Sequence, residues 1–387
     1  MKIVSSLLSS QFIKTVFDDL LMTLKQKIVQ NSYLNHVLIF FLFLFFRLIR
    51  IIIKDKRKKN KIFAIISLNK LGDTVFTIPA IDQLLKLYKD TTFYIICFGD
   101  SKIIYNQIIK NAKYCILNKN DFHFNGRLAS LTAIKKLKSI SPNTIVDVTG
   151  AINSASLILT SRCQTIYGVN ESLYKGIYDE YQILRNKPHQ IDIYFDALGS
   201  LIPERLKKFS GYKNNNNNLG VILIQPLAGW KAKEWGINNF LKLYKKISYH
   251  NKCALIIPKN ELEQDVLSTL EQSGFNIILT ENIEDLINNI NKCKIFVSND
   301  SGPLQIAALL GKPTYGIYGP TNPIFHLPRG ENHIFVQKQL KCTPKTTKYC
   351  YTFGGKYCPH YDCMNLLNVD EVFESLESLI AKLTDYN

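Results

Sequence analysis

Short apolar runs alternate with amphipathic stretches along most of this chain. The runs are rich in Ile, Val and aromatic residues, and the stretches between them have a helical period. This alternation predicts βαβ units that build a mostly parallel sheet. The predicted strands lie at residues 62–68, 91–97, 113–117, 143–148, 220–226, 253–258, 275–279, 294–297 and 313–319.

The alternating pattern occurs twice, before and after a run of five Asn at 214–218. Because poly-Asn buries no apolar surface, we predict that this run links two domains, 62–213 and 219–387. A length of 387 residues fits two domains of ordinary size. Both are predicted to be doubly wound, Rossmann-like α/β domains. Two such domains face each other across a cleft and bind ligands at the carboxyl ends of their strands.

The stretch Val297–Pro323 reads as strand, tight turn, helix and strand. Asp300 or Ser301 is expected at the helix N-cap, Pro303 in the first turn and Gly311 at the C-terminus. A helix that begins with Ser-Gly presents free N–H groups and the positive end of its dipole, which suits a phosphate. The alternative is an ordinary βαβ unit in which these residues only cap the helix.

Residues 1–61 have a different pattern. Apolar residues recur every four positions from Val4 to Ile28, as in an amphipathic helix, and an apolar run of ten follows at Val37–Phe46. Twelve Lys and Arg against three Asp give this segment +9 of the net charge of +17, and six of these basic residues lie in Lys54–Lys61. Apolar sequence beside a basic run predicts an anionic membrane surface as the partner, and no nucleic-acid-binding motif is found.

Residues 34–53 allow three arrangements. Ten apolar residues are too few to span a hydrocarbon core of about 30 Å, and the wider window includes Arg47 and Arg50, which we expect to extend to lipid phosphates. The segment is either a marginal transmembrane helix with a cytosolic basic run or a helix lying in the membrane interface, which we favour. A buried helical hairpin would leave the basic run unexplained.

The nine cysteines are isolated in the sequence except near the C-terminus. An odd count and the lack of a cleavable signal pattern favour a reducing, cytosolic setting. Cys342, Cys350, Cys358 and Cys363 are separated by seven, seven and four residues, whereas a structural zinc site prefers paired short spacings. We therefore favour free or transiently paired thiols in a surface loop and assign no metal ligands.

Three segments resemble the glycosyltransferase family 9 (heptosyltransferase) enzymes. SLNKLGDTVFTIPAI at Ser67–Ile81 is similar to the family's S-x-GD-x-x-x-T-x-PA segment, and PLAGWKAKEWGINNF at Pro226–Phe240 to its donor-side loop. NDSGPLQIAALLGKPTYGIYGPTNP at Asn299–Pro323 is similar to its D-[ST]-G-P segment. One segment alone would be weak, but three in this order are specific. The resemblance covers about residues 62–385 and implies the GT-B fold.

The resemblance also implies a reaction. Heptose would pass from ADP-heptose to a lipopolysaccharide core or a similar lipid-linked glycan, with inversion, without a metal or other cofactor, at the cytoplasmic face of the bacterial inner membrane. Asp73 corresponds to the proposed catalytic base, and a direct displacement at the anomeric carbon needs one carboxylate to take the acceptor proton. Lys233 corresponds to the donor-loop lysine that contacts the diphosphate.

The other donor-binding residues that the resemblance implies lie in the second domain. They are Glu261, Asp300, Ser301, Gly302, Pro303, Leu304 and Gln305. Gln305 stands where the family usually has His, and Gln can donate a hydrogen bond to a phosphate or ribose but cannot carry a proton. Two alternatives therefore stay open: a transferase of the same fold that uses another nucleotide sugar for a surface glycan, and a non-catalytic nucleotide-binding scaffold.

Overall fold

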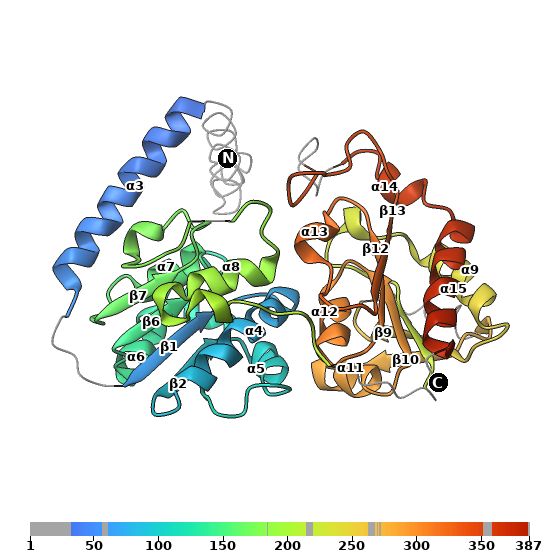
Figure 1. Cartoon of the computed structure of the whole chain (residues 1–387), viewed down its shortest axis with the longest axis horizontal. Helices are drawn as coiled ribbons and strands as arrows, with labels where there is room; N and C mark the ends of the chain where they lie inside the picture. The colour runs from blue at the N-terminus through green and yellow to red at the C-terminus, as the bar shows by residue number, and fades with distance from the viewer. Residues whose placement is uncertain are drawn as a thin grey trace, which may run out of the picture.

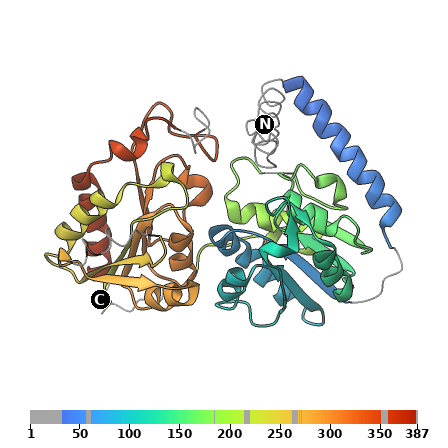
Figure 2. The ribbon, with the colours of Figure 1, turned by 180° about the vertical axis from the view of Figure 1, so that it is seen from behind.

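The computed structural model describes residues 32–55, 61–183, 185–213, 220–261, 268, 270, 272–350 and 358–385. Two α/β domains lie beside each other, and a long helix lies on the outer side of the first domain (Figure 1). The view from behind shows the same arrangement (Figure 2). Three predicted features fall outside the described residues: the helix at residues 4–28, most of the basic run 54–61 and the Asn linker 214–218.

Each domain contains a parallel sheet of the doubly wound type, as predicted. The first sheet has the order β3-β2-β1-β6-β7, and the second has the order β10-β9-β8-β11-β12-β13. Two short strands, β4 and β5, form an antiparallel pair. The strands are β1 (Ile62–Ser67), β2 (Thr92–Cys97), β3 (Lys113–Ile116), β4 (Phe122–His123), β5 (Leu128–Ala129), β6 (Thr144–Asp147), β7 (Thr165–Gly168), β8 (Ile222–Gln225), β9 (Cys253–Pro258), β10 (Ile277–Thr280), β11 (Ile295–Asn299), β12 (Thr314–Tyr318) and β13 (His333–Gln337).

In each sheet, the central strand pairs with one strand on either side, and a separate crossover connection leads to each of the two. Ile65 of β1 lies beside Ile95 of β2 and Val146 of β6. In the second sheet, β8 likewise lies between β9 and β11. The direction of winding therefore reverses beside β1 and beside β8. In open α/β sheets, ligands bind outside the carboxyl ends of the strands at such reversals.

Helices cover both sheets. The α-helices are α3 (Ser32–Ile53), α4 (Leu71–Leu87), α5 (Gly99–Tyr105), α6 (Leu131–Ile140), α7 (Ile152–Ile158), α8 (Gln190–Ala197), α9 (Ile237–Ile247), α11 (Ile283–Ile290), α12 (Gly302–Leu309), α13 (Pro323–His326), α14 (Asp362–Asn365) and α15 (Val369–Asp385). The 3-10 turns are η1 (Lys119–Asp121), η2 (Lys175–Ile177), η3 (Gly199–Leu201), η4 (Glu204–Leu206) and η5 (Lys231–Lys233).

Helix α4 begins at Leu71, directly after the turn that follows β1. Proline in a helix interior removes a backbone donor and usually ends the helix, and Pro79 lies inside α4. Here the segment from Thr74 to Ile81 is buried, and its packing outweighs the cost of the proline. The start at Leu71 puts Asp73 in the first turn of α4.

One buried hydrophobic cluster extends across both domains, and each domain also has a cluster of its own. The buried side chains of the shared cluster include Ile65 and Ile95 from the first sheet and Leu223 and Phe296 from the second. Helices α4 and α12 pack against each other across this boundary. The guanidinium of Arg329 lies 2.6 Å from Oδ2 of Asp192, and His189 Nε2 lies 2.9 Å from the carbonyl oxygen of Leu327. These contacts hold the facing edges of the two domains together.

Helix α3 packs along one side of the first domain. The prediction that Arg47 and Arg50 extend to lipid phosphates is wrong. Arg47 donates to the carbonyl of Tyr178 at 3.0 Å, and Arg50, which is 2% exposed, lies 2.6 Å from Oδ2 of Asp179. Both arginines fall on the face of α3 that meets the domain, where protein oxygens are their acceptors. Among the described residues, no helix is both long enough and apolar enough to cross a bilayer.

Candidate functional site

A cleft of about 1130 Å³ opens between the carboxyl ends of the two sheets. One wall is the turn from β1 into α4, residues 68–72, and the other is formed by residues 225–229 and the start of α12. Among the predicted donor-binding residues, Glu261, Ser301, Gly302 and Pro303 line it. The sequence thus identified four residues of a cleft that both domains build.

Helices α4 and α12 meet at their N-termini. A Cβ added to Gly302 would lie 3.3 Å from the backbone nitrogen of Gly72, and one added to Gly72 would lie 3.4 Å from the Gly302 Cα. Glycine at both positions therefore permits this approach. The positive ends of two helix dipoles converge at the cleft, and Ser301 occupies the N-cap of α12 as predicted. This arrangement suits an anionic group.

Asp300 forms a buried pair with Lys233. Its Oδ2 atom lies 2.6 Å from Lys233 Nζ and accepts a second hydrogen bond from the Thr321 hydroxyl, also at 2.6 Å. Burial alone would raise the pKa of Asp300, but Lys233 and other positive or donating neighbours outweigh it and lower the pKa. Lys233 Nζ also lies 4.7 Å from the ring centroid of Trp230. The Asp300 carboxylate thus stays ionised and holds the Lys233 ammonium beside the turn before α12.

Asp73 lies close to this pair. Burial raises the pKa of its carboxyl group, and the opposing charges of Lys233, Lys70 and Lys348 reduce that rise without cancelling it. Within the described part of the chain, no side chain donates a hydrogen bond to the Asp73 carboxylate. A partly desolvated carboxylate with a raised pKa and no fixed partner can accept a proton from a bound hydroxyl group.

Two residues close to the candidate site, Lys348 and Thr321, were not identified from the sequence. Lys348 belongs to the tail that follows β13, and its Nζ lies 2.7 Å from Glu171 and 3.2 Å from the Gln190 side-chain oxygen, both in the first domain. Nothing in the local sequence of this tail marks Lys348. Thr321, by contrast, lies in the quoted GPTNP sequence and could have been inferred from it.

The side chains of Leu304 and Gln305 do not reach the cleft. Leu304 is 0% exposed in the hydrophobic core, and Gln305 is 3% exposed and donates a hydrogen bond from Nε2 to the His326 carbonyl at 2.9 Å. The prediction that the Gln305 side chain contacts a phosphate is therefore wrong for this structure. The helical period directs position 305 toward α13. Its amide instead ties α12 to α13.

The four C-terminal cysteines are free thiols. Burial and the neighbouring thiols of Cys342, Cys358 and Cys350 raise the pKa of Cys363 to about 11, so these sulfur atoms lie near one another. Within the described ranges, no group of three or more His, Cys, Asp or Glu side chains has an arrangement that could hold a metal ion.

Comparison with known proteins supports the resemblance seen in the sequence. Residues 131–353 match the family model described as glycosyltransferase family 9 (heptosyltransferase). Lipooligosaccharide heptosyltransferase 2 of Campylobacter jejuni is 26% identical over 324 residues, which are 80% of this chain and 95% of that protein.

Solved structures show the same fold. The structure of E. coli ADP-heptose lipopolysaccharide heptosyltransferase II gives a TM-score of 0.64 at 16% identity, covering 83% of this chain and 98% of that one. E. coli heptosyltransferase WaaC with ADP gives 0.62 at 14% identity, covering 82% of this chain and 99% of that one. The architecture is thus the predicted GT-B fold. The family match extends over more than half of the chain, which therefore belongs to glycosyltransferase family 9 and is a glycosyltransferase.

Proposed function

We propose that this glycosyltransferase moves heptose from ADP-heptose to a lipopolysaccharide core or a similar lipid-linked glycan. The names of its relatives, lipooligosaccharide and lipopolysaccharide heptosyltransferases, support this reaction. The main structural support is one juxtaposition. The N-terminus of α12 and Lys233 would face the donor, and Asp73, which follows Gly72 where α4 meets α12, would face the acceptor.

In the proposed reaction, the Asp73 carboxylate takes the proton of the acceptor hydroxyl group. The hydroxyl oxygen attacks the anomeric carbon of the heptose while the bond from that carbon to the β-phosphate oxygen of ADP breaks. A single displacement of this kind inverts the anomeric configuration and needs only one carboxylate. The raised pKa of Asp73 suits this role, because a base works best when its pKa is near the operating pH.

The leaving diphosphate gains negative charge as the bond breaks. We propose that the free N–H groups at the start of α12, including those of Gly302 and Leu304, and the ammonium of Lys233 stabilise it. Asp300 holds Lys233 in position, and Glu261, which lines the cleft, would contact the nucleotide. These groups supply the positive charge that a metal provides in other transferases, so we propose a metal-independent reaction.

A mass measurement tests the reaction. Incubation with ADP-heptose and a truncated core lipid should add one heptose to the acceptor, and EDTA should leave the rate unchanged. Asp73→Asn should lower product formation by about a hundredfold or more. Asp82→Asn is the matched control, because Asp82 lies on the same helix and its ion pair among the described residues is with the exposed Lys86. Equal rates for wild type and Asp73→Asn would refute the base assignment.

The donor is tested separately by thermal shift. ADP should stabilise the protein more than UDP or GDP, since a bound ligand raises stability according to its affinity for the folded state. Stronger stabilisation by UDP or GDP would favour another nucleotide sugar. Nucleotide binding without any transfer, whatever the donor, would favour a non-catalytic scaffold.

We further propose that the enzyme works at the cytoplasmic face of the bacterial inner membrane, with residues 1–61 bound to anionic lipid. The acceptor is itself a membrane lipid, and this segment holds about half of the chain's net positive charge. The full-length protein should sediment with vesicles that contain phosphatidylglycerol, and less so as salt is added. Equal sedimentation with uncharged vesicles would contradict the electrostatic part of this proposal.

A further inference from the structure

Helix α3 exposes a continuous apolar face. Seven large apolar side chains on it are between 39% and 81% exposed. With about 100° of rotation per residue, they occupy one arc of roughly 140°. A soluble surface seldom gathers so many large apolar side chains in one stripe unless something covers it. These residues are Phe40, Phe41, Leu44, Phe45, Leu48, Ile51 and Ile52.

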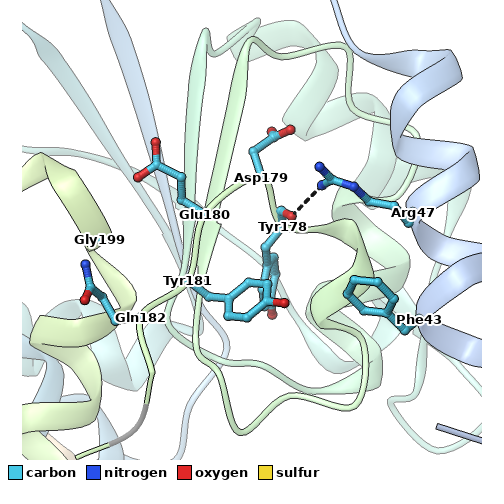
Figure 3. Close-up of a pocket in the computed structure, with 8 residues that line it drawn as sticks. All are labelled: Phe43, Arg47, Tyr178, Asp179, Glu180, Tyr181, Gln182 and Gly199. Carbon is cyan, nitrogen blue, oxygen red and sulfur yellow. Dashed lines mark hydrogen bonds between the residues drawn. The ribbon is translucent and has the colours of Figure 1, made fainter. Parts of the chain in front are cut away.

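The opposite face of α3 is held against the first domain by charged contacts. Oδ2 of Asp179 lies 2.6 Å from Arg50, and Oδ1 lies 2.8 Å from Lys54. Arg50 also donates to the carbonyl of Cys163 at 3.0 Å. Figure 3 shows Arg47 directed from α3 to the carbonyl of Tyr178, beside Asp179. We refer to the contacts of Arg47, Arg50 and Lys54 with residues 178–179 as the α3 clamp.

The clamp is anchored in the sheet of the first domain. The hydroxyl of Tyr178 donates to Oδ2 of the fully buried Asp147 at 2.8 Å, and Asp147 is the last residue of β6. At η2, a side chain in place of Gly176 would collide with the carbonyl of Phe43 in α3. The helix therefore has a fixed position relative to the carboxyl edge of the sheet.

The segment 169–182, which contacts α3, also contacts a residue near the candidate site. Within residues 169–182, Asp179 binds the helix, and Glu171 lies 2.7 Å from Lys348 Nζ. Lys348 is one of the cations that act on Asp73. A single segment thus connects the exposed helix to the surroundings of the proposed base.

The basic residues that follow α3 indicate what covers its apolar face. Lys54 lies one residue beyond the end of α3, and the sequence continues with Lys56, Arg57, Lys58, Lys59 and Lys61. A helix with one apolar face and a basic run at its end is typical of helices that lie in an anionic membrane interface. A second protein copy or another apolar segment would gain nothing from these cations.

From this we infer that α3 lies in the plane of an anionic bilayer with this apolar face immersed, and that the α3 clamp fixes the orientation of the active-site cleft relative to the lipid surface. This inference rests on the proposed membrane association and adds two features to it: which side chains enter the lipid, and which contacts transmit the orientation.

The first test changes only the exposed face in the full-length protein. Phe41→Glu, Leu48→Glu and Ile52→Glu together should lower sedimentation with phosphatidylethanolamine–phosphatidylglycerol vesicles by about tenfold or more, because charge is excluded from the acyl region. The matched control places three Glu at exposed apolar positions elsewhere, Leu131→Glu, Tyr249→Glu and Leu366→Glu. It carries the same change in charge and should bind as well as wild type.

Three outcomes would overturn the inference. The triple α3 variant could bind vesicles like wild type, the control could lose binding equally, or light scattering could show that wild type is a dimer and the α3 variant a monomer. The third result would mean that a second copy covers the face. If wild type itself does not bind anionic vesicles, the proposed membrane association fails instead, so the two failures are distinguishable.

The second test addresses the clamp. Asp179→Asn keeps the shape of the side chain but removes the charge that Arg50 and Lys54 contact. It should bind vesicles like wild type, turn over a soluble acceptor at the wild-type rate and turn over a vesicle-embedded acceptor several-fold more slowly. If this variant does not fold, Lys54→Met removes the more exposed partner and should show a smaller loss. Equal loss on both acceptors, or no loss on either, would refute the role of the clamp.

Discussion

The ammonium group of Lys233 lies 2.6 Å from Oδ2 of Asp300. The pair joins the loop before α9 to the turn before α12, and Thr321 contributes a hydrogen bond to the same carboxylate oxygen. Because Asp300 is buried, it needs a positive partner, and the lysine is held over the start of α12 in consequence. In the proposed reaction, this is where the leaving diphosphate would gain charge.

Lys233→Ala should lower kcat/KM by about a hundredfold, because it removes one preorganised cation from the leaving group. Steady-state kinetics with ADP-heptose measures this change. Lys231→Ala is the matched control, since Lys231 lies in the same turn, is 76% exposed and pairs only at the surface with Glu234. A wild-type kcat/KM for Lys233→Ala would remove this lysine from the proposed mechanism.

Asp73→Asn should lower the turnover rate by about a hundredfold or more while raising the melting temperature at neutral pH. Burial raises the pKa of Asp73, so the ionised form is less favourable in the folded state than in the unfolded chain. The stability that the protonated group contributes is present at low pH and is lost as pH rises through the folded-state pKa. The neutral Asn avoids this loss.

The two effects of Asp73→Asn are measured by product formation and by calorimetry across pH. The gain in melting temperature should disappear in acid, where Asp73 of the wild type is protonated as well. A variant that loses activity and also melts lower at every pH would indicate a structural role for Asp73.

Gly302→Ala should weaken ADP binding and lower the free energy of unfolding by about 1–3 kcal/mol. The added Cβ would lie 3.3 Å from the backbone nitrogen of Gly72, so the two helix N-termini would have to separate slightly. Gly99→Ala is the matched control, because Gly99 also begins a helix at the cleft but has nothing within 4 Å of an added Cβ. Calorimetry and ADP titration should leave the control unchanged.

Arg50→Met should destabilise the folded chain by about 3 kcal/mol or more, since it leaves Asp179 poorly compensated at a buried site. Burial favours a raised pKa for Asp179, but hydrogen bonds from Arg50 and Lys54 outweigh it and lower the pKa. The stability that the Asp179 carboxylate contributes to the folded state is therefore present above its unfolded pKa of about 3.9. It is lost as pH falls through the pKa of Asp179 in the folded state.

Urea unfolding at pH 7 and at pH 3 measures this contribution. The difference between wild type and Arg50→Met should shrink at the lower pH. The double change Arg50→Met with Asp179→Leu should recover part of the loss, because no buried unpaired charge remains: Lys54, which also loses its partner, is 29% exposed. A double variant that is as unstable as the sum of its two single variants would show that the ion pair has no special energetic coupling.

The repeated architecture could be predicted without the structure. Alternating apolar runs and helical periods depend on local geometry, so nine strands and α12 could be predicted closely. The strands β4, β5, β7 and β13 were not predicted. Ser301 at the N-cap of α12 and Gly311 at its C-terminal end, in a left-handed conformation with φ of 74°, follow from the same local rules. The three quoted segments were enough to indicate the family.

Which side chains meet in the folded protein depends on tertiary packing. Burial keeps Pro79 inside α4, and a helix face directs Gln305 to His326 and not to the cleft. Lys348 reaches the site through a contact with Glu171 that joins positions 177 residues apart, which no local pattern encodes. Arg50 looked like a lipid-facing cation, but it is a buried partner of Asp179. The physical reason is the same in each case: a side chain's partner is fixed by the packing of distant segments, whereas its secondary structure is fixed largely by its neighbours in the chain.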